Sequence, residues 1–277
     1  MLGRAVAEAL VEGGVDVTPL GHTELDLSRA ETIEAAISVD SPRYDWVFNC
    51  AAYTDVDGAE SDAALADAIN GYGVGALAKC CAAVDATLIH YGSDYVFDGI
   101  GKKPYPVDHP LAPVNAYGRS KALGERLMRE SGVHHLYLRT SWLYAPWGNN
   151  FVLTMAGLTR DNDRLTVVDD QRGRPTSCRQ LARATLELLD AGAAGTLHVT
   201  DGGECSWYDL ARVVRDARGH ECEIVPCTSA EYPRPAPRPA YSVLDLSLAE
   251  AILGPMAPYE EAVACALDAA PDPGRAG

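Results

Sequence analysis

The sequence predicts an α/β fold built on a parallel sheet whose two faces are covered by helices. Short apolar stretches of strand length alternate with segments in which apolar residues recur at helical spacing. Stretches such as residues 46–52 are apolar almost throughout, which is typical of parallel strands that are buried on both faces. With 277 residues, 47% of them hydrophobic, the chain can form a sizeable core.

The first element predicted from the sequence is a helix. Leu2, Val6 and Leu10 place an apolar stripe on one face, and the pair Gly13-Gly14 ends the periodic segment. Residues 15–20 then read as a strand.

The middle of the chain continues the alternation of helix and strand. A loop rich in proline, residues 104–113, interrupts it once. Glycines at 71, 73 and 75 loosen the helix expected over 63–84. The expected helices cover residues 30–37, 63–84 and 116–130, and the expected strands cover 46–52, 87–91 and 136–141.

Beyond residue 145 the periodic segments become shorter and more mixed, which indicates a smaller lobe. They lie at 165–169, 181–189, 196–200 and 223–226, with a helix at 207–217. We therefore expect a first domain over 1–145, to which later segments return, and a lobe formed mainly by 146–267. Residues 268–277 have little to bury and are expected to be a frayed tail.

Composition excludes several classes of function. A formal charge of -16 argues against nucleic acid or an anionic membrane as the main partner. No apolar run of about 18 residues is present, and the start does not resemble a signal peptide, so a cytoplasmic protein is expected. The eight cysteines show no zinc or disulfide spacing, which predicts reduced core thiols and no metal site.

Two residues four apart on the predicted helix 116–130 suggest acid–base chemistry. Tyr117 and Lys121 leave the same helix face. A neighbouring ammonium lowers the pKa of a phenol from about 10, and the pair can then protonate a carbonyl oxygen. A tyrosine and a lysine on an exposed helix face are the ordinary alternative.

Polar and small residues follow two predicted strands, at the carboxyl edge where open α/β sheets bind ligands. Ser93 follows the strand 87–91, where its hydroxyl could bond a substrate carbonyl beside Tyr117. Ala51 and Ala52 end the strand 46–52, where a flat ring could lie against backbone. Ordinary turn and loop polarity is the alternative for both stretches.

Together these stretches resemble the extended short-chain dehydrogenase/reductase family, and within it the dTDP-4-dehydrorhamnose reductase branch. The resemblance runs in family order along nearly the whole chain. The matching stretches are LGRAVAEAL, ELDLS, VFNCAAYTDVDGAE, AINGYGVGALA, SDYVFDG, NAYGRSKALGE, LRTSWLYAPWGNNFV, VVDDQRGRPTS, GTLHVTDGGECSWYDLA and RPAYSVLDLS.

The resemblance implies a Rossmann-type, doubly wound sheet and a role for each matching residue. The catalytic residues would be Ser93, Tyr117 and Lys121. Those at the cofactor would be Gly3, Asp26, Leu27, Ala51, Ala52 and Tyr53, with Tyr117 and Lys121 reaching it as well. Those at the substrate would be Asp57, Ser93, Tyr95 and Trp142.

The implied activity is NADPH-dependent reduction of the 4-keto group of a nucleotide-linked deoxysugar, first of all dTDP-4-dehydrorhamnose to dTDP-rhamnose. The strand expected over 15–20 has no acidic residue immediately at its tip, where such a residue would repel a 2′-phosphate. NADPH is therefore expected, and NADH stays open. A nucleotide-sugar epimerase or dehydratase and a non-catalytic regulatory subunit are the alternatives. A homodimer is compatible with the sequence.

Family members begin with a strand and a G-x-x-G-x-x-G turn, and Gly3 matches the last glycine of that turn. The resemblance leads us to expect about a dozen further residues, one strand and its turn, before Met1. A start site assigned too late is the simplest explanation. The activity of the chain as written stays open at this point.

Overall fold

A four-stranded parallel sheet lies at the centre of the protein. The structure, a computed structural model, describes residues 1–270. The sheet contains, in spatial order, β1 (Trp46–Asn49), β2 (Thr87–Ser93), β3 (His135–Thr140) and β8 (Gly195–His198). Ser93 pairs with Thr140 in the register of β2 and β3. Because the strands are parallel, their carboxyl ends meet at one edge of the sheet, and the predicted site residues follow them there.

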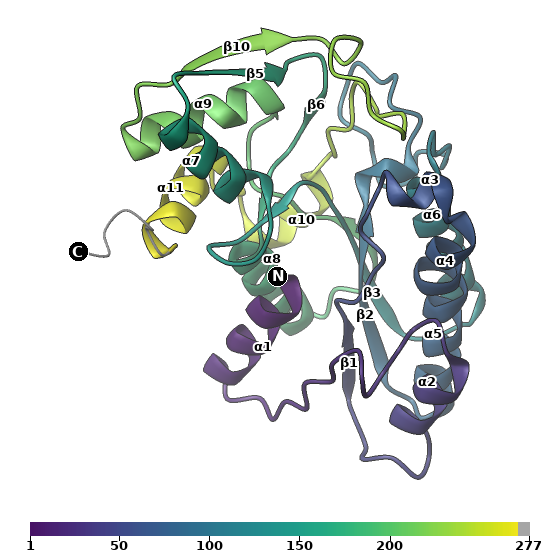
Figure 1. The fold of residues 1–277 in the computed structure, drawn as a ribbon. Coiled ribbons are helices and arrows are strands. Elements are labelled where there is room, and N and C mark those ends of the chain that lie inside the picture. Colours follow the sequence, from purple (N-terminus) through teal and green to yellow (C-terminus); the bar gives the residue numbers. More distant parts are fainter. Residues whose placement is uncertain (271–277) are drawn as a thin grey trace.

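Three helices pack on one face of this sheet (Figure 1). They are α1 (Leu2–Glu12), α8 (Cys178–Asp190) and α10 (Ser247–Leu253). The apolar stripe of α1 lies against α8 and joins one core cluster with Ile89 and Leu138 of the sheet. The sequence prediction for this first helix is therefore confirmed.

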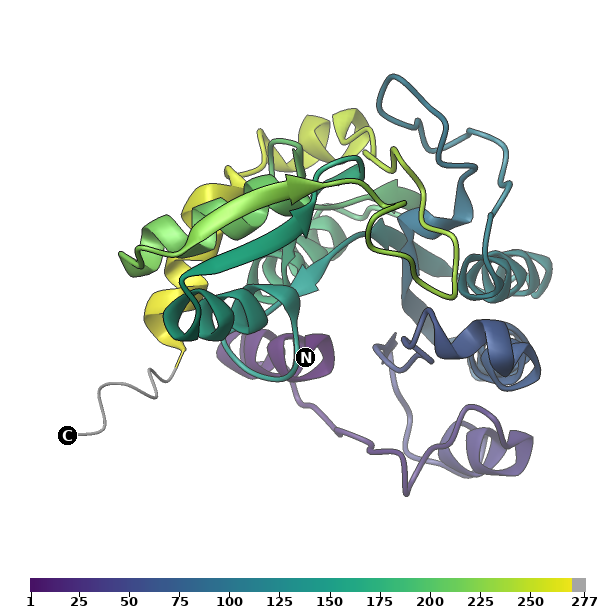
Figure 2. The ribbon, with the colours of Figure 1, turned by 45° about the horizontal axis from the view of Figure 1, so that its top comes forward.

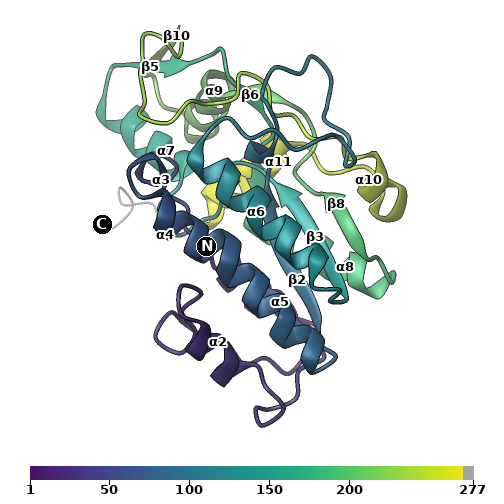
Figure 3. The ribbon, with the colours of Figure 1, turned by 90° about the vertical axis from the view of Figure 1, so that its right-hand side faces the viewer.

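The other face is covered by helices from the first half of the chain, with α5 and α6 in front of β2 and β3 in Figure 3. These elements are α2 (Ala30–Ala36), α3 (Gly58–Ser61), α4 (Ala63–Asp67), η1 (Ala68–Gly73), α5 (Val74–Ala83) and α6 (Ala116–Glu130). The segment η1 is a π-helical turn between α4 and α5. It coincides with the glycines that loosen the predicted helix over 63–84.

A second group of elements has its own core, centred on Val152, Leu210, Val214 and Val263. In Figure 2 its two parallel strands lie side by side against helices. The group contains α7 (Phe151–Asp161), β5 (Arg164–Val168), α9 (Trp207–Arg218), β10 (Glu223–Cys227) and α11 (Tyr259–Ala269). Short strand pairs join it to the central sheet region: β4 (Leu143–Tyr144) with β7 (Thr176–Ser177), and β6 (Arg172–Gly173) with β9 (Cys205–Ser206).

One predicted strand is wrong. Residues 15–20 are extended but belong to no strand, because a strand requires a hydrogen-bonded neighbour and no described segment pairs with them. The local pattern is nevertheless real, since Val15 and Val17 pack against the core while Asp16 and Thr18 are exposed.

The ends of two further predicted elements also differ from the structure. The strand expected over 46–52 stops at Asn49. At the other end of the chain, α11 extends to Ala269, so the expected frayed tail does not begin at residue 268; its part over 271–277 lies outside the described residues.

Candidate active site

Ser93 ends β2 at the carboxyl edge of the sheet. Its side chain is buried, and the hydroxyl donates to Asp94 Oδ1 at 3.1 Å and accepts from the Tyr95 amide at 3.1 Å. The second bond caps the short 3-10 helix η2 (Asp94–Val96). Strand pairing and capping together fix the position of this hydroxyl.

The helix α6 brings Tyr117 to Ser93. The Asn115 side chain caps the helix by accepting from the Gly118 amide at 2.7 Å. A Cβ on Gly118 would lie 2.1 Å from the Tyr95 carbonyl oxygen, so only glycine permits this close approach of helix and loop. This arrangement places the Tyr117 side chain beside Ser93, close enough for Ser93 to influence the pKa of the phenol.

Lys121 lies one turn further along α6 and is buried. Its ammonium donates to the Tyr91 carbonyl oxygen at 2.8 Å. Burial lowers the pKa of Lys121 to about 8, and the nearby Glu125 carboxylate opposes this shift. An ammonium has three donors, and the backbone carbonyl uses one of them, which leaves capacity for hydroxyl groups of a ligand.

The pKa of Tyr117 differs from the sequence expectation. Burial raises it to about 12, the neighbouring Ser93 side chain lowers it in part, and the nearby Asp94 carboxylate raises it. Tyr117 is therefore protonated at neutral pH, which is the state that a proton donor requires.

Two further side chains complete this end of the sheet. Burial raises the pKa of Asp94 to about 7, and its Oδ2 atom has no hydrogen-bond partner among the described residues. The Tyr95 ring meets the Tyr117 ring edge to face, with centroids 5.9 Å apart. Ser93, Tyr95, Tyr117 and Lys121 thus form one cluster.

Three of the residues predicted to hold the cofactor, Gly3, Ala51 and Ala52, lie at the start of α1 or just after the end of β1. No side chain caps the first amides of α1, and a Cβ on Gly3 would lie 3.4 Å from Cys50 Cβ. Ala51 is exposed and Ala52 is half-buried, and both follow Cys50, which lies beside that helix end. Unpaired amides at a helix start and a small-residue wall fit the phosphate and flat rings of a dinucleotide.

The other three predicted cofactor residues differ in accessibility. Leu27 is buried in the core, whereas the neighbouring Asp26 carboxylate is partly accessible and accepts from the Ser28 hydroxyl and amide at 2.7 and 2.9 Å. The side-chain amide of Asn70 holds the backbone of Tyr53: it accepts from the Tyr53 amide and donates to the Tyr53 carbonyl oxygen, both at 2.9 Å. It also donates to the Ser120 hydroxyl at 3.0 Å.

Trp142, a predicted substrate residue, has a strained backbone with φ of 47°. Its indole is stacked on Trp207 with ring centroids 3.6 Å apart and 10° between the planes. A Cβ on Gly173 would lie 2.7 Å from the indole, so a glycine is required beneath it. Trp207 in turn donates to Gln171 Oε1 at 3.2 Å.

Asp57, the remaining predicted substrate residue, faces protein rather than an open site. Its carboxylate accepts from Arg234, from Arg238 and from the Ala236 amide. Sequence reasoning missed these arginines, as it missed Asn70 and Trp207. Their partners lie far away in the sequence, so no local pattern marks them.

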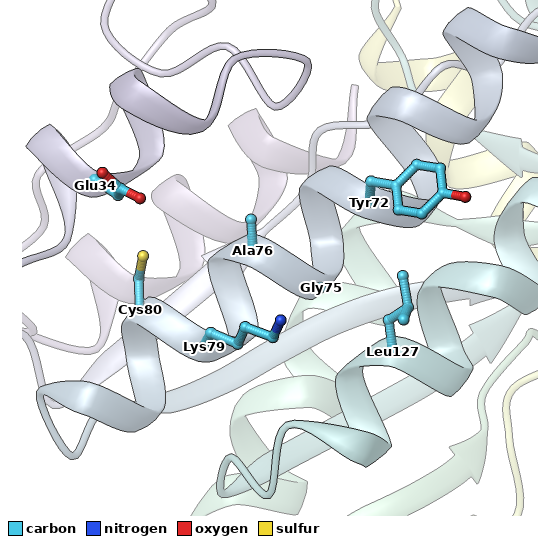
Figure 4. Close-up of a pocket in the computed structure, with 7 residues that line it drawn as sticks. All are labelled: Glu34, Tyr72, Gly75, Ala76, Lys79, Cys80 and Leu127. Carbon is cyan, nitrogen blue, oxygen red and sulfur yellow. The ribbon is translucent and has the colours of Figure 1, made fainter.

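A shallow depression of about 250 Å³ lies on the outer helical face, away from this cluster (Figure 4). α2, η1, α5 and α6 form it. Its lining residues are Glu34, Tyr72, Gly75, Ala76, Lys79, Cys80 and Leu127, none of which is a predicted site residue. The cluster at the end of β2 holds the acid–base residues, so we place the candidate active site there.

Two classes of site are absent from the part of the chain that the structure describes. No helix within residues 1–270 has the length and apolarity needed to cross a membrane. In the same range no three His, Cys, Asp or Glu side chains are grouped so that they could hold a metal ion.

Curated relatives that are named as reductases of dTDP sugars match most of the chain. A dTDP-4-dehydrorhamnose reductase from Mycolicibacterium smegmatis is 40% identical over 268 residues, which cover 95% of this chain and 81% of that protein. A probable dTDP-4,6-dihydroxy-2-methyloxan-3-one 4-ketoreductase from Streptomyces antibioticus is 42% identical over 247 residues, 88% of this chain and 83% of that protein.

A solved structure agrees with this similarity. The dTDP-4-dehydrorhamnose reductase from Bacillus anthracis, crystallised in complex with NADP, superposes with a TM-score of 0.91 at 33% identity. The match covers 96% of this chain and 95% of that one.

The model of one protein family, described as RmlD substrate binding domain, matches residues 1–271. Together with the relatives, this match shows that the chain belongs to that family of oxidoreductases, within the dTDP-4-dehydrorhamnose reductase branch of the extended short-chain dehydrogenase/reductases.

Proposed function

We propose that the protein uses NADPH to reduce the 4-keto group of a nucleotide-linked deoxysugar, converting dTDP-4-dehydrorhamnose to dTDP-rhamnose. The observation that carries the proposal is the placement of Ser93 at the end of β2, with Tyr117 and the buried Lys121 one turn apart on α6 beside it. The names of the relatives support the substrate, and the NADP complex of one relative supports the cofactor.

In this mechanism two hydroxyl groups bind the carbonyl oxygen of the substrate. Ser93 and Tyr117 lie beside each other at the carboxyl end of β2, so one oxygen atom would accept from both hydroxyl groups. When bound, the cofactor supplies the hydride for the carbonyl carbon. Tyr117 gives its phenolic proton to the oxygen as negative charge develops there.

Lys121 supports this proton transfer. Its ammonium, one helical turn from Tyr117, stabilises negative charge on the phenolate once the proton has left. Gly3, Asp26, Leu27, Ala51, Ala52 and Tyr53 would hold the cofactor. Residues 146–267 would supply most of the substrate-binding lobe, with the Trp142 indole packing on sugar or base.

A second candidate substrate is another 4-keto sugar linked to dTDP. The 42% identical relative named as a 4-ketoreductase of a different dTDP sugar favours this alternative. The chemistry at Ser93 and Tyr117 is the same for both, so the two candidates differ only in the sugar that the lobe accepts.

The test is to incubate the purified protein with NADPH and dTDP-4-dehydrorhamnose and to follow the loss of reduced-nicotinamide absorbance. We expect dTDP-rhamnose, identified by mass spectrometry, to form in equal amount. A protein that consumes no NADPH with either dTDP sugar would refute the proposal. Turnover without net oxidation of the cofactor would indicate the epimerase or dehydratase alternative.

A further inference from the structure

The Asp57 carboxylate is bonded on both oxygens to one distant segment, residues 228–241. Oδ2 accepts from Arg234, with Nε at 2.9 Å, and Oδ1 accepts from the Ala236 amide at 3.1 Å and pairs with Arg238 at 3.0 Å. Arg234 lies 177 residues further along the chain. The carboxylate is only 16% exposed, so little of it faces solvent.

The same segment is tied to the start of the catalytic helix. The side chain of Asn115, the residue that caps α6, donates to the Pro237 carbonyl oxygen at 2.9 Å. Figure 1 shows the yellow-green loop after β10 reaching α3 and the start of α6. Tyr117 lies two residues beyond Asn115, so the segment 228–241 is held at the start of the helix that carries Tyr117.

The charges at this junction do not cancel. Two guanidinium groups face one carboxylate, which leaves one net positive charge. Burial opposes the charged form of Asp57, but the Ala236 amide and the two arginines outweigh it and lower its pKa. Arg238 also favours the ionised phenol of Tyr95, whose ring contacts Tyr117, so this cation lies near the candidate active site.

We propose that Asp57 is a positioning residue: it fastens the segment 228–241 beside the Ser93–Tyr117 pair and so holds Arg234 and Arg238 for an anionic substrate. The identity of that anion, the diphosphate of a nucleotide sugar, rests on the proposed function, whereas the fastening does not. Paired guanidinium groups are well suited to phosphate oxygens. A carboxylate that touched such a substrate would instead repel it, which argues against direct contact.

The test compares Asp57→Asn with the matched control Asp55→Asn. Asp55 is exposed in the same loop. Within residues 1–270 its carboxylate accepts only from the Gly58 amide, at 2.9 Å, a bond that asparagine can keep. In Asp57→Asn we expect faster deuterium uptake confined to 228–241, and a KM for the nucleotide sugar raised about tenfold or more, the size of losing charge-assisted bonds. The kcat and the Kd for NADPH should change less than about twofold, and Asp57→Glu should restore part of the KM.

Several results would overturn the proposal. Unchanged deuterium uptake and KM in Asp57→Asn would do so, as would an equal loss of NADPH affinity. A lower KM would show that Asp57 competes with the substrate instead of placing the arginines. If Asp57→Asn does not fold, Arg234→Gln replaces it, because that side chain is 49% exposed and its loss should give the same pattern at smaller size.

The fastening can also be judged without turnover. Binding of dTDP, measured by calorimetry, should weaken in Asp57→Asn and stay unchanged in Asp55→Asn. If the wild-type protein reduces neither dTDP sugar, the proposed function fails, while deuterium uptake and dTDP binding still decide the role of Asp57. Equal dTDP affinity in the wild type and Asp57→Asn would refute the placement of the arginines for this anion, and unchanged deuterium uptake over 228–241 would refute the fastening.

Discussion

Replacing Arg139 with methionine should destabilise the protein strongly, because this arginine neutralises a carboxylate inside the core. Arg139 is 1% exposed and Glu125 is fully buried. Two of its nitrogens donate to the two Glu125 oxygens at 3.0 and 2.6 Å, and a third donates to the Val107 carbonyl oxygen at 2.8 Å and to His198 Nε2 at 3.0 Å. The network therefore joins α6, β3, β8 and a loop.

The magnitude follows from what the substitution leaves behind. Glu125 would keep only the bond from Arg129, a side chain that is 47% exposed. Breaking a buried pair by removing one partner costs about 3–5 kcal/mol, since the remaining charge is uncompensated. A chain of this size loses about 2–4 °C in melting temperature per kcal/mol, so a drop of roughly 6–20 °C is expected.

Arg129→Met is the matched control. It removes the other guanidinium bound to Glu125, but from an exposed position, so the free energy of unfolding should change by about 1 kcal/mol or less. Urea and thermal unfolding, followed by circular dichroism without ligand, measure both variants. Equal small losses in the two would refute the reasoning, and a Glu125→Met/Arg139→Met double variant should recover part of the stability.

Three further predictions concern single side chains. Tyr117→Phe should lower turnover about 10²-fold or more while leaving NADPH affinity nearly intact, since it removes only the proton donor; wild-type turnover in steady-state assays would exclude this role. Trp142→Ala should weaken nucleotide-sugar binding more than NADPH binding, and equal losses by calorimetry would contradict it. Asp201→Asn should flatten the pH dependence of stability. Burial raises the pKa of Asp201 to about 7. The folded state therefore holds a proton that the unfolded state releases near pH 4. The stability that the protonated Asp201 contributes is complete below pH 4 and is lost as the pH rises to 7. Melting temperatures of both proteins across that window measure it, and identical slopes would count against the assignment.

Local signals predicted the helix that carries the catalytic residues. The boundaries predicted for residues 116–130 agree with α6, because apolar spacing and the Asn115 cap are both encoded within the segment itself. The same holds for the end of β2, where an apolar run and the following serine are adjacent in sequence.

Features that depend on distant partners could not be predicted in this way. The predicted alternation of buried and exposed side chains around Val15 and Val17 was correct. A strand forms only if a neighbouring strand pairs with it, and the sequence pattern carries no information about pairing. Likewise, the sequence placed Asp57 in a polar stretch after a strand. It could not show that Arg234 and Arg238, which pair with this carboxylate, come from a loop after β10.

The π-helical turn η1 has a consequence for length variation in this part of the chain. Before it, Ala66 of α4 packs near Ala116 of α6; after it, Val74 and Leu77 of α5 belong to a different core cluster. Deleting one residue from Ala68–Gly73 would rotate all that follows by about 100° relative to α4. Either the Asn70 amide or the apolar face of α5 would then point away from its partner. A substitution in η1 disturbs the contacts of one position, as at Gly73, where a Cβ would lie 2.1 Å from the Leu27 carbonyl oxygen. A single-residue deletion instead changes the orientation of two packed surfaces at once.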